Sequence, residues 1–194
     1  MSKKRIGLAL TGSFCTFEKA LEAAKALITD GWDVVPIFSE NAYTTDTRFG
    51  RAKDWVDTFE SLTGNKAISS LVQAEPIGPQ KLLDLLLIAP CTGNTLAKLT
   101  YGITDTCVTM SAKSQLRNGR PVLIAVSTND ALGGSAKNIG MLLNYRNIYF
   151  VPLRQDDPDA KPRSMIADFS LIPKAAQAAL EGKQLQPIYL PSST

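Results

Sequence analysis

The stretch that decides the fold is LLDLLLIAPCTGNTLAKLTYGITD, residues 82–105. It opens with a continuous apolar run, which is typical of a strand buried on both faces of a parallel sheet. Pro90 ends the run, small polar residues follow, and helical periodicity resumes at Thr95 and continues to about Arg117, interrupted near Gly102. A buried strand that ends in small polar residues just before a helix predicts a binding site at that edge of a sheet.

Strands and helices alternate on both sides of this stretch. Upstream, RIGLAL (residues 5–10) and DVVPIFS (33–39) flank a helical pattern over 17–30, a unit that predicts two parallel strands with a right-handed crossover. The other predicted elements are a polar loop at 40–50, a helix over 51–62, a helical lead-in from Gln80, the strand PVLIAVST (121–128), a helix over 134–146, the strand NIYFVPL (147–153) and a helix over 170–180. This alternation predicts one α/β domain over residues 1–194, with a flavodoxin-like, doubly wound parallel sheet in three layers, αβα.

The composition excludes several kinds of chemistry. The chain has no histidine, so a Ser-His-Asp triad, an imidazole base or a histidine metal site is excluded. The three cysteines show no CxxC spacing, so we predict neither a disulfide framework nor a metal site, and the catalytic residues are unknown. A net charge of +3 gives no reason to expect nucleic acid. Apolar runs fall far short of the roughly 20 residues that cross a bilayer, and the N-terminus lacks the apolar core of a signal peptide, so a cytoplasmic protein without a membrane partner is expected.

Polar residues gather where four of the predicted strands end. These segments are Gly12-Ser13-Phe14, Ser39-Glu40-Asn41, residues 91–95 and residues 127–130. Each one alone is explained as a helix cap, but four together at one sheet edge favour a site, and helix N-termini there favour a phosphate. Neither a G-x-G-x-x-G nor a P-loop sequence is present. FMN, which flavodoxin-like sheets bind without such a fingerprint, is therefore the leading candidate cofactor.

Three segments carry a family resemblance. GSFCTFEKA, APCTGNTLAKLTYGITD and PVLIAVSTNDALGGSAKN resemble the signature regions of the flavoprotein superfamily that contains the cysteine decarboxylases of the coenzyme A pathway and the flavin prenyltransferases. Those relatives read Pro-Ala-Ser-Ala-Asn-Thr and Pro-x-Met-Asn where this chain has Pro90-Cys91-Thr92-Gly93-Asn94-Thr95 and Ser127-Thr128-Asn129. Together with RQDDPDAKPRS (154–164), these departures are similar to one branch, the B subunits of dipicolinate synthases from spore-forming bacteria.

The resemblance implies where the cofactor binds. Ser13 and Ser39 would contact the FMN phosphate, and residues 90–95 would line the flavin ring, with Gly93 allowing close approach and Thr95 capping the following helix. The full set predicted to bind the cofactor is Gly12, Ser13, Phe14, Ser39, Pro90, Cys91, Thr92, Gly93, Asn94, Thr95, Ser127, Thr128 and Asn129.

The resemblance also implies a reaction and partners. The implied reaction is oxidation of a dihydrodipicolinate-type precursor to pyridine-2,6-dicarboxylate. The implied partners are an A subunit, which alone would bind NAD(P), and further copies of this chain in a homo-oligomer, a trimer or a multiple of trimers. The implied location is the mother-cell cytoplasm of a sporulating bacterium. Two alternatives stay open: a cofactor-free scaffolding subunit of the same complex, or an independent flavin-dependent decarboxylase or prenyltransferase. The decarboxylases of this superfamily use a histidine near the flavin, which this chain lacks.

The polar segment 154–164 lies where relatives have a flap over the site. We predict that it closes on the substrate and that Arg154 or Lys161 meets a substrate carboxylate, because guanidinium and ammonium groups bind carboxylates. The alternative is a solvated loop whose charges offset one another. For Cys15 and Cys91 we favour packing over a redox role.

Overall fold

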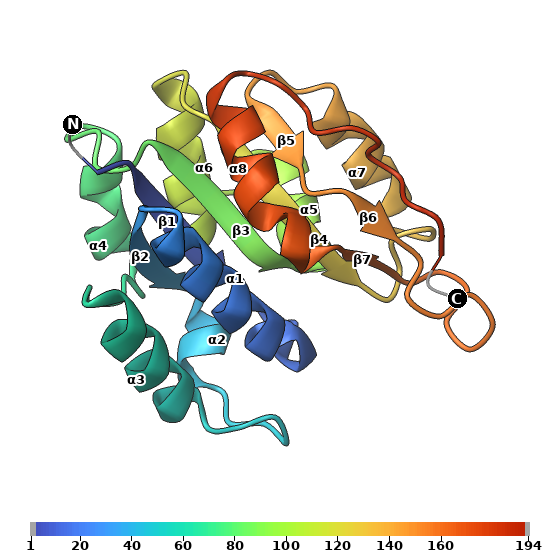
Figure 1. Ribbon diagram of the computed structural model, residues 1–194, viewed down its shortest axis with the longest axis horizontal. Helices are drawn as coiled ribbons and strands as arrows, with labels where there is room; N and C mark the ends of the chain where they lie inside the picture. The colour runs from blue at the N-terminus through green and yellow to red at the C-terminus, as the bar shows by residue number, and fades with distance from the viewer. Residues whose placement is uncertain (1–2, 193–194) are drawn as a thin grey trace.

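The computed structural model describes residues 3–192 and shows one sheet covered by helices on both faces (Figure 1). Five parallel strands run in the order β2-β1-β3-β4-β5. They are β1 (Arg5–Leu10), β2 (Asp33–Phe38), β3 (Leu85–Cys91), β4 (Val122–Thr128) and β5 (Ile148–Phe150). This is the flavodoxin-like strand order, and it confirms the predicted fold class.

The helices divide into two layers. In Figure 1, α1 and α8 lie in front of the sheet and α5, α6 and α7 lie behind it. The helices are α1 (Phe17–Thr29), α2 (Glu40–Thr44), α3 (Ala52–Thr63), α4 (Leu71–Ala74), α5 (Gly93–Thr100), α6 (Cys107–Arg117), α7 (Ala136–Leu143) and α8 (Ile172–Leu180), with 3-10 turns η1 (Phe14–Thr16), η2 (Glu75–Ile77) and η3 (Phe169–Leu171). No helix among residues 3–192 is long and apolar enough to cross a membrane.

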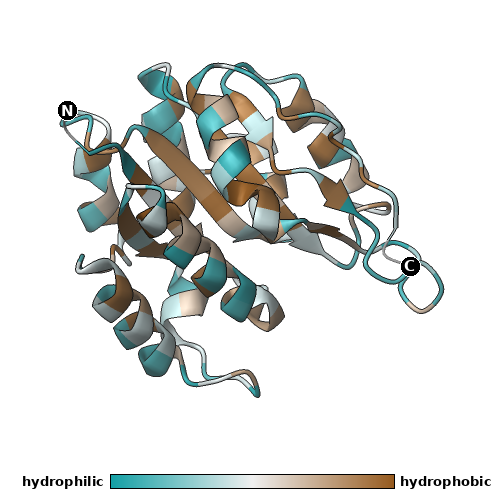
Figure 2. Cartoon of the chain, in the orientation of Figure 1, coloured by the Kyte–Doolittle hydropathy of each residue, from teal (hydrophilic) through white to brown (hydrophobic). Residues whose placement is uncertain are grey.

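The core follows from the strand sequences. All seven residues of β3 are buried, as are the first six of β4, because helices cover both faces of the sheet. Figure 2 shows β3 largely in brown, the hydrophobic end of its scale. On α1, Phe17, Ala20, Ala24 and Leu27 form the buried face at helical spacing. Continuous burial along the strands leaves their carboxyl ends as the places where polar side chains can gather.

The sheet is not wholly parallel, which corrects the prediction of one continuous strand over residues 147–153. The chain leaves β5 at Phe150, and Leu153–Arg154 (β6) pairs antiparallel with Met165–Ala167 (β7). β7 in turn pairs antiparallel with the last two residues of β4. The hairpin between β6 and β7 is the segment predicted as a flap, and this pairing brings its base to the carboxyl end of β4.

Two further differences concern short helices. The predicted polar loop after β2 begins with α2, because the Ser39 hydroxyl accepts a hydrogen bond from the Ala42 amide at 3.3 Å and caps the helix. The expected helical lead-in from Gln80 is absent, and helical turns occur earlier, in α4 and η2. The predicted break near Gly102 is confirmed, since α5 ends at Thr100 and α6 begins at Cys107.

Candidate functional site

Two adjoining hollows lie at the carboxyl ends of the parallel strands, and they share Gly12 and Thr92. The flap hollow, about 440 Å³, is lined by the β1 loop, the end of β4, the flap and Phe49. The polar hollow, about 370 Å³, lies between the ends of β1, β2 and β3 and helices α5 and α6. Of the residues predicted to bind the cofactor, the flap hollow brings together Gly12, Ser13, Phe14, Thr92, Ser127, Thr128 and Asn129, and the polar hollow Gly12, Ser39, Thr92, Asn94 and Thr95.

Hydroxyl groups fasten three strand ends to one another. The buried Thr11 hydroxyl donates to the Pro90 carbonyl at 2.7 Å and accepts from the Thr92 amide at 3.1 Å, which joins β1 to β3. The Ser13 and Ser127 hydroxyls share a hydrogen bond of 2.8 Å, which joins the β1 loop to β4. These hydrogen bonds satisfy the hydroxyl groups and hold the ends of β1, β3 and β4 in fixed positions.

Gly12 and Gly93 differ in what surrounds them. A Cβ at Gly12 would find only Phe14 Cε2, at 3.8 Å, so the space above Gly12 is open. A Cβ at Gly93 would lie 2.5 Å from Ser135 Oγ and 3.0 Å from Thr128 Oγ1. The implied role of Gly93 in approaching a ligand is therefore not what the structure shows. Gly93 packs the start of α5 against the loop after β4, and the open space lies above Gly12 instead.

The N-terminus of α5 is capped by Thr92, whose hydroxyl accepts from the Thr95 amide at 3.3 Å. The two hydroxyls also share a hydrogen bond of 3.0 Å, and Thr95 is buried inside the first turn of the helix. The implied role of Thr95 as the cap thus belongs to Thr92. Because Thr92 lines both hollows, the free amides at the start of α5 lie at the same edge of the sheet as the hollows.

Lys98 is a lining residue of the polar hollow that the sequence reasoning missed. Its ammonium lies 2.8 Å from a carboxylate oxygen of Asp105, and this hydrogen bond holds the pKa of the Asp105 carboxyl below its usual value. The signal was present in the sequence, because Lys98 follows Asn94 by four residues, which places both on one side of α5. The polar hollow therefore combines hydroxyls, amides and one cation with two carboxylates, Glu40 and Asp105.

The flap contributes Asp156, Lys161 and Ser164 to the flap hollow. The Lys161 ammonium lies 3.5 Å from Asp156 Oδ2. Burial alone would raise the pKa of the Asp156 carboxyl, but hydrogen bonds and Lys161 outweigh it and hold that pKa below its usual value. Asp156 is thus an anion near neutral pH, and Lys161 is its counter-ion.

The other residue predicted to bind substrate, Arg154, lies elsewhere. Its guanidinium forms an ion pair with Asp168 at 2.5 Å, and it lines a separate hollow of about 710 Å³ between α1 and the turn η3. The structure therefore brings only one of the two predicted substrate residues, Lys161, to the strand-end site.

The buried cysteines have the environment of packing residues. Cys91 is fully buried at the end of β3, and burial raises the pKa of its thiol. Burial likewise raises the pKa of Cys107 to about 11, and its thiol donates to the Phe38 carbonyl at 2.8 Å. Cys15 is exposed and lines the flap hollow. Pro90, although in the predicted set, contributes through its carbonyl bond to Thr11 rather than by lining either hollow.

A flavodoxin-like sheet with hydroxyl-rich strand ends is typical of flavoproteins. The chain belongs to the Flavoprotein family, whose sequence model matches residues 1–163. It is 48% identical to the B subunit of dipicolinate synthase from Bacillus subtilis (strain 168), over 95% of this chain and 92% of the relative. The crystal structure of the dipicolinate synthase B subunit from Bacillus halodurans superposes with a TM-score of 0.90 at 42% identity, covering 98% of this chain and 97% of that one.

More distant structures share the fold. A dodecameric FMN-dependent Ubix-like decarboxylase from Escherichia coli O157:H7 superposes with a TM-score of 0.62 at 21% identity, over 76% of this chain and 79% of that chain. The resemblance to dipicolinate synthase B subunits and to the wider flavoprotein superfamily, inferred above from three segments, is thus confirmed over nearly the whole chain.

Proposed function

We propose that this chain is the FMN-binding B subunit of a dipicolinate synthase, acting with an A subunit to form pyridine-2,6-dicarboxylate from a dihydrodipicolinate-type precursor. One observation carries the cofactor part of this proposal: the open space above Gly12, where the flap hollow and the polar hollow meet. The identity of 48% to a dipicolinate synthase B subunit supports the reaction.

The lining residues fit FMN. Ser39 and Asn94 offer hydrogen-bond donors for its phosphate in the polar hollow, and Lys98 would exchange its pairing with Asp105 for that phosphate. On the other side of Gly12, residues 127–129 and Phe14 offer amide, hydroxyl and aromatic surface for its ring. When bound, the flavin supplies two-electron redox chemistry. Conversion of the precursor to the aromatic product removes two electrons and two protons from its ring, which matches that chemistry.

The chain's own residues bind and shield the substrate. Lys161 on the flap provides a positive charge for one carboxylate of a dicarboxylate, and the flap itself limits access of water to the flap hollow. Because the chain has no histidine, none of its own side chains supplies an imidazole to move protons. The A subunit would bring NAD(P), and the B subunits would assemble as a trimer or a multiple of trimers in the mother-cell cytoplasm.

The first test is an absorbance spectrum of the purified chain in the visible range, followed by titration with FMN and then by assay with and without the A subunit. We expect flavin bands or saturable FMN binding, and product only when both subunits are present. A colourless chain that does not bind added FMN yet supports product formation by the A subunit would replace this proposal with the cofactor-free scaffolding subunit. Product formation without the A subunit would indicate an independent enzyme.

A further inference from the structure

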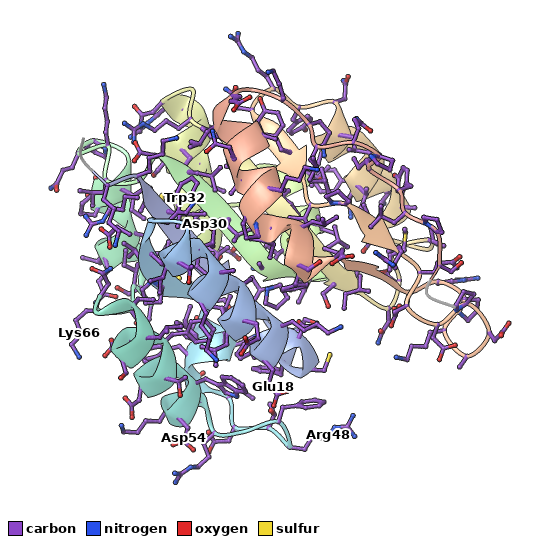
Figure 3. All side chains as sticks on the ribbon, viewed as in Figure 1. Glu18, Asp30, Trp32, Arg48, Asp54 and Lys66 are labelled. Carbon is purple, nitrogen blue, oxygen red and sulfur yellow. The ribbon has the colours of Figure 1, made fainter. Side chains whose placement is uncertain are left out.

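The loop between α2 and α3, residues 45–51, forms a wall of the flap hollow that sequence analysis treated only as a polar connection. Phe49 at its tip lines the flap hollow together with Lys161, and 41% of the Phe49 side chain is exposed. The Arg48 guanidinium stacks on the Phe49 ring, with Cζ 4.8 Å from the ring centroid. Figure 3 shows Arg48 at the tip of this loop, on the same side of the molecule as Glu18 in the first turn of α1.

The tip of this loop is held in one conformation. Thr47 and Gly50 exchange two backbone hydrogen bonds of 3.0 and 3.1 Å, and the Thr47 hydroxyl accepts from the Phe49 amide at 3.1 Å. Gly50 has φ +134°, and a Cβ there would lie 2.7 Å from Trp55 Nε1, so glycine is required at this position. Trp55 in turn packs edge-on against the buried ring of Phe17. Arg48 and Phe49 are therefore presented by a turn anchored to the core.

The residues that line the flap hollow include more carboxylates than cations, so a dicarboxylate ligand would need a further cation. The lining contains two carboxylates, Asp130 and Asp156, and one cation, Lys161, which already pairs with Asp156. Within residues 3–192, Arg48 forms no ion pair with any carboxylate. A ligand with two carboxylates adds negative charge to a hollow that already holds Asp130 and Asp156, so it needs a second cation. Arg48 does not itself line the hollow, but its guanidinium stacks on the lining residue Phe49 and can supply that charge.

We propose that Arg48 and Phe49 form a substrate-binding wall of the flap hollow for a planar dicarboxylate. Phe49 packs on the ring of the ligand, Arg48 binds one carboxylate through two parallel hydrogen bonds, and Lys161 binds the other. This inference rests on the substrate class in the proposed function, but it does not require the cofactor.

The test uses the full chain with Arg48→Met, Phe49→Leu and, as a matched control, Arg51→Met. Arg51 is an exposed arginine three residues further along, which pairs with Asp54 at the start of α3. The probes are pyridine-2,6-dicarboxylate and its monocarboxylate analogue pyridine-2-carboxylate, measured by calorimetry, with FMN titrated separately. We expect Arg48→Met and Phe49→Leu each to weaken dicarboxylate binding about tenfold or more, with Arg48→Met affecting the monocarboxylate less. Arg51→Met should bind as the parent does, and FMN affinity should be the same in all four proteins.

Three results would overturn the inference: no dicarboxylate binding by the parent chain, equal affinities of Arg48→Met and Arg51→Met, or a loss of FMN affinity in Arg48→Met that matches the loss of dicarboxylate affinity. The last result would assign the wall to the cofactor. If the parent chain binds dicarboxylate through Arg48 but does not bind FMN, the inference stands and the cofactor part of the proposed function fails.

Discussion

Gly12 and Gly93 show how two residues of one type serve a site in different ways. The position of a Cβ on Gly93 is already occupied by Ser135 and Thr128, whereas the position of a Cβ on Gly12 opens onto the junction of two hollows. Packing at the start of α5 depends on Gly93, whereas the proposed FMN site depends on the open space above Gly12. The two roles can be separated by giving each residue the same small side chain.

We expect Gly12→Ala to weaken FMN binding about tenfold or more, since its methyl group would occupy the ligand's space, and to leave the free energy of unfolding equal or slightly higher. Gly93→Ala should lower the free energy of unfolding by roughly 1–3 kcal/mol, because its methyl group would overlap Ser135 Oγ. FMN fluorescence titration and urea unfolding of the cofactor-free protein measure the two effects. Unchanged FMN affinity in Gly12→Ala would contradict the assignment of the junction as the cofactor site.

The thiols provide a second test at this scale. Because burial raises the pKa of Cys91 and Cys107, these two stay protonated and shielded near pH 8, while Cys15 is exposed. We expect a thiol reagent to label one cysteine rapidly in the folded protein and all three in urea. Mass spectrometry of the labelled peptides identifies which cysteine reacts. Rapid labelling of Cys91 in folded protein would mean that the end of β3 opens to solvent.

Some residues of the candidate site can be predicted from the sequence and others cannot, for a physical reason. Ser13, Ser39 and Asn129 each follow a strand. The carboxyl ends of parallel strands lie at one edge of the sheet, and this does not depend on how the helices pack. Arg48 and Phe49 lie in the middle of a connection, so their position depends on the Thr47–Gly50 turn and its contact with Trp55. Gly93 was assigned to the ligand because a glycine in sequence does not reveal which group approaches it.

At the scale of elements, predictability follows length. The long strands and α1, α3 and α6 were predicted within a few residues, because each carries enough apolar positions to show its period. β6 and β7 have two and three residues, too few to show one, and they form through pairing with the end of β4. This hairpin fixes which flap residues line the flap hollow.

The hairpin predicts different roles for Arg154 and Lys161. Arg154 ties β6 to Asp168, with side chains 28% and 25% exposed, so Arg154→Met should lower the free energy of unfolding by about 1 kcal/mol or less and leave dicarboxylate affinity unchanged. Lys161→Met should weaken dicarboxylate binding about tenfold with unchanged stability. Calorimetry with pyridine-2,6-dicarboxylate and urea unfolding of both variants measure these effects. A loss of dicarboxylate affinity in Arg154→Met would restore Arg154 as a substrate residue.

At the scale of the whole molecule, the absence of histidine shapes the response to pH. Histidine is the side chain that ordinarily titrates between about pH 5 and 8, so the folded and unfolded chains exchange few protons in that range. Below it, Glu60, Asp105, Asp156 and Glu181 have lowered pKa values in the folded state. Their contribution to the free energy of unfolding is present above the pKa values of the unfolded chain. It is lost as pH falls through the lower pKa values of the folded state. Stability should therefore decrease below about pH 4.5.

At alkaline pH the stability depends on pH with the opposite sign, because it decreases as pH rises. The Cys91 and Cys107 thiols ordinarily titrate at 9.0, and burial raises both pKa values in the folded state. Their contribution to the free energy of unfolding is complete below the thiol pKa of the unfolded chain. It decreases as pH rises through 9.0 toward the higher pKa values of the folded state. We therefore expect the urea midpoint of the cofactor-free protein to be flat from about pH 5 to 8 and to fall on both sides. Cys91→Ala should fall less steeply above pH 9.0 than the parent chain, because it removes one of the two buried thiols. A step in the midpoint near pH 6.5 would contradict this account, because no side chain of this protein ordinarily titrates there.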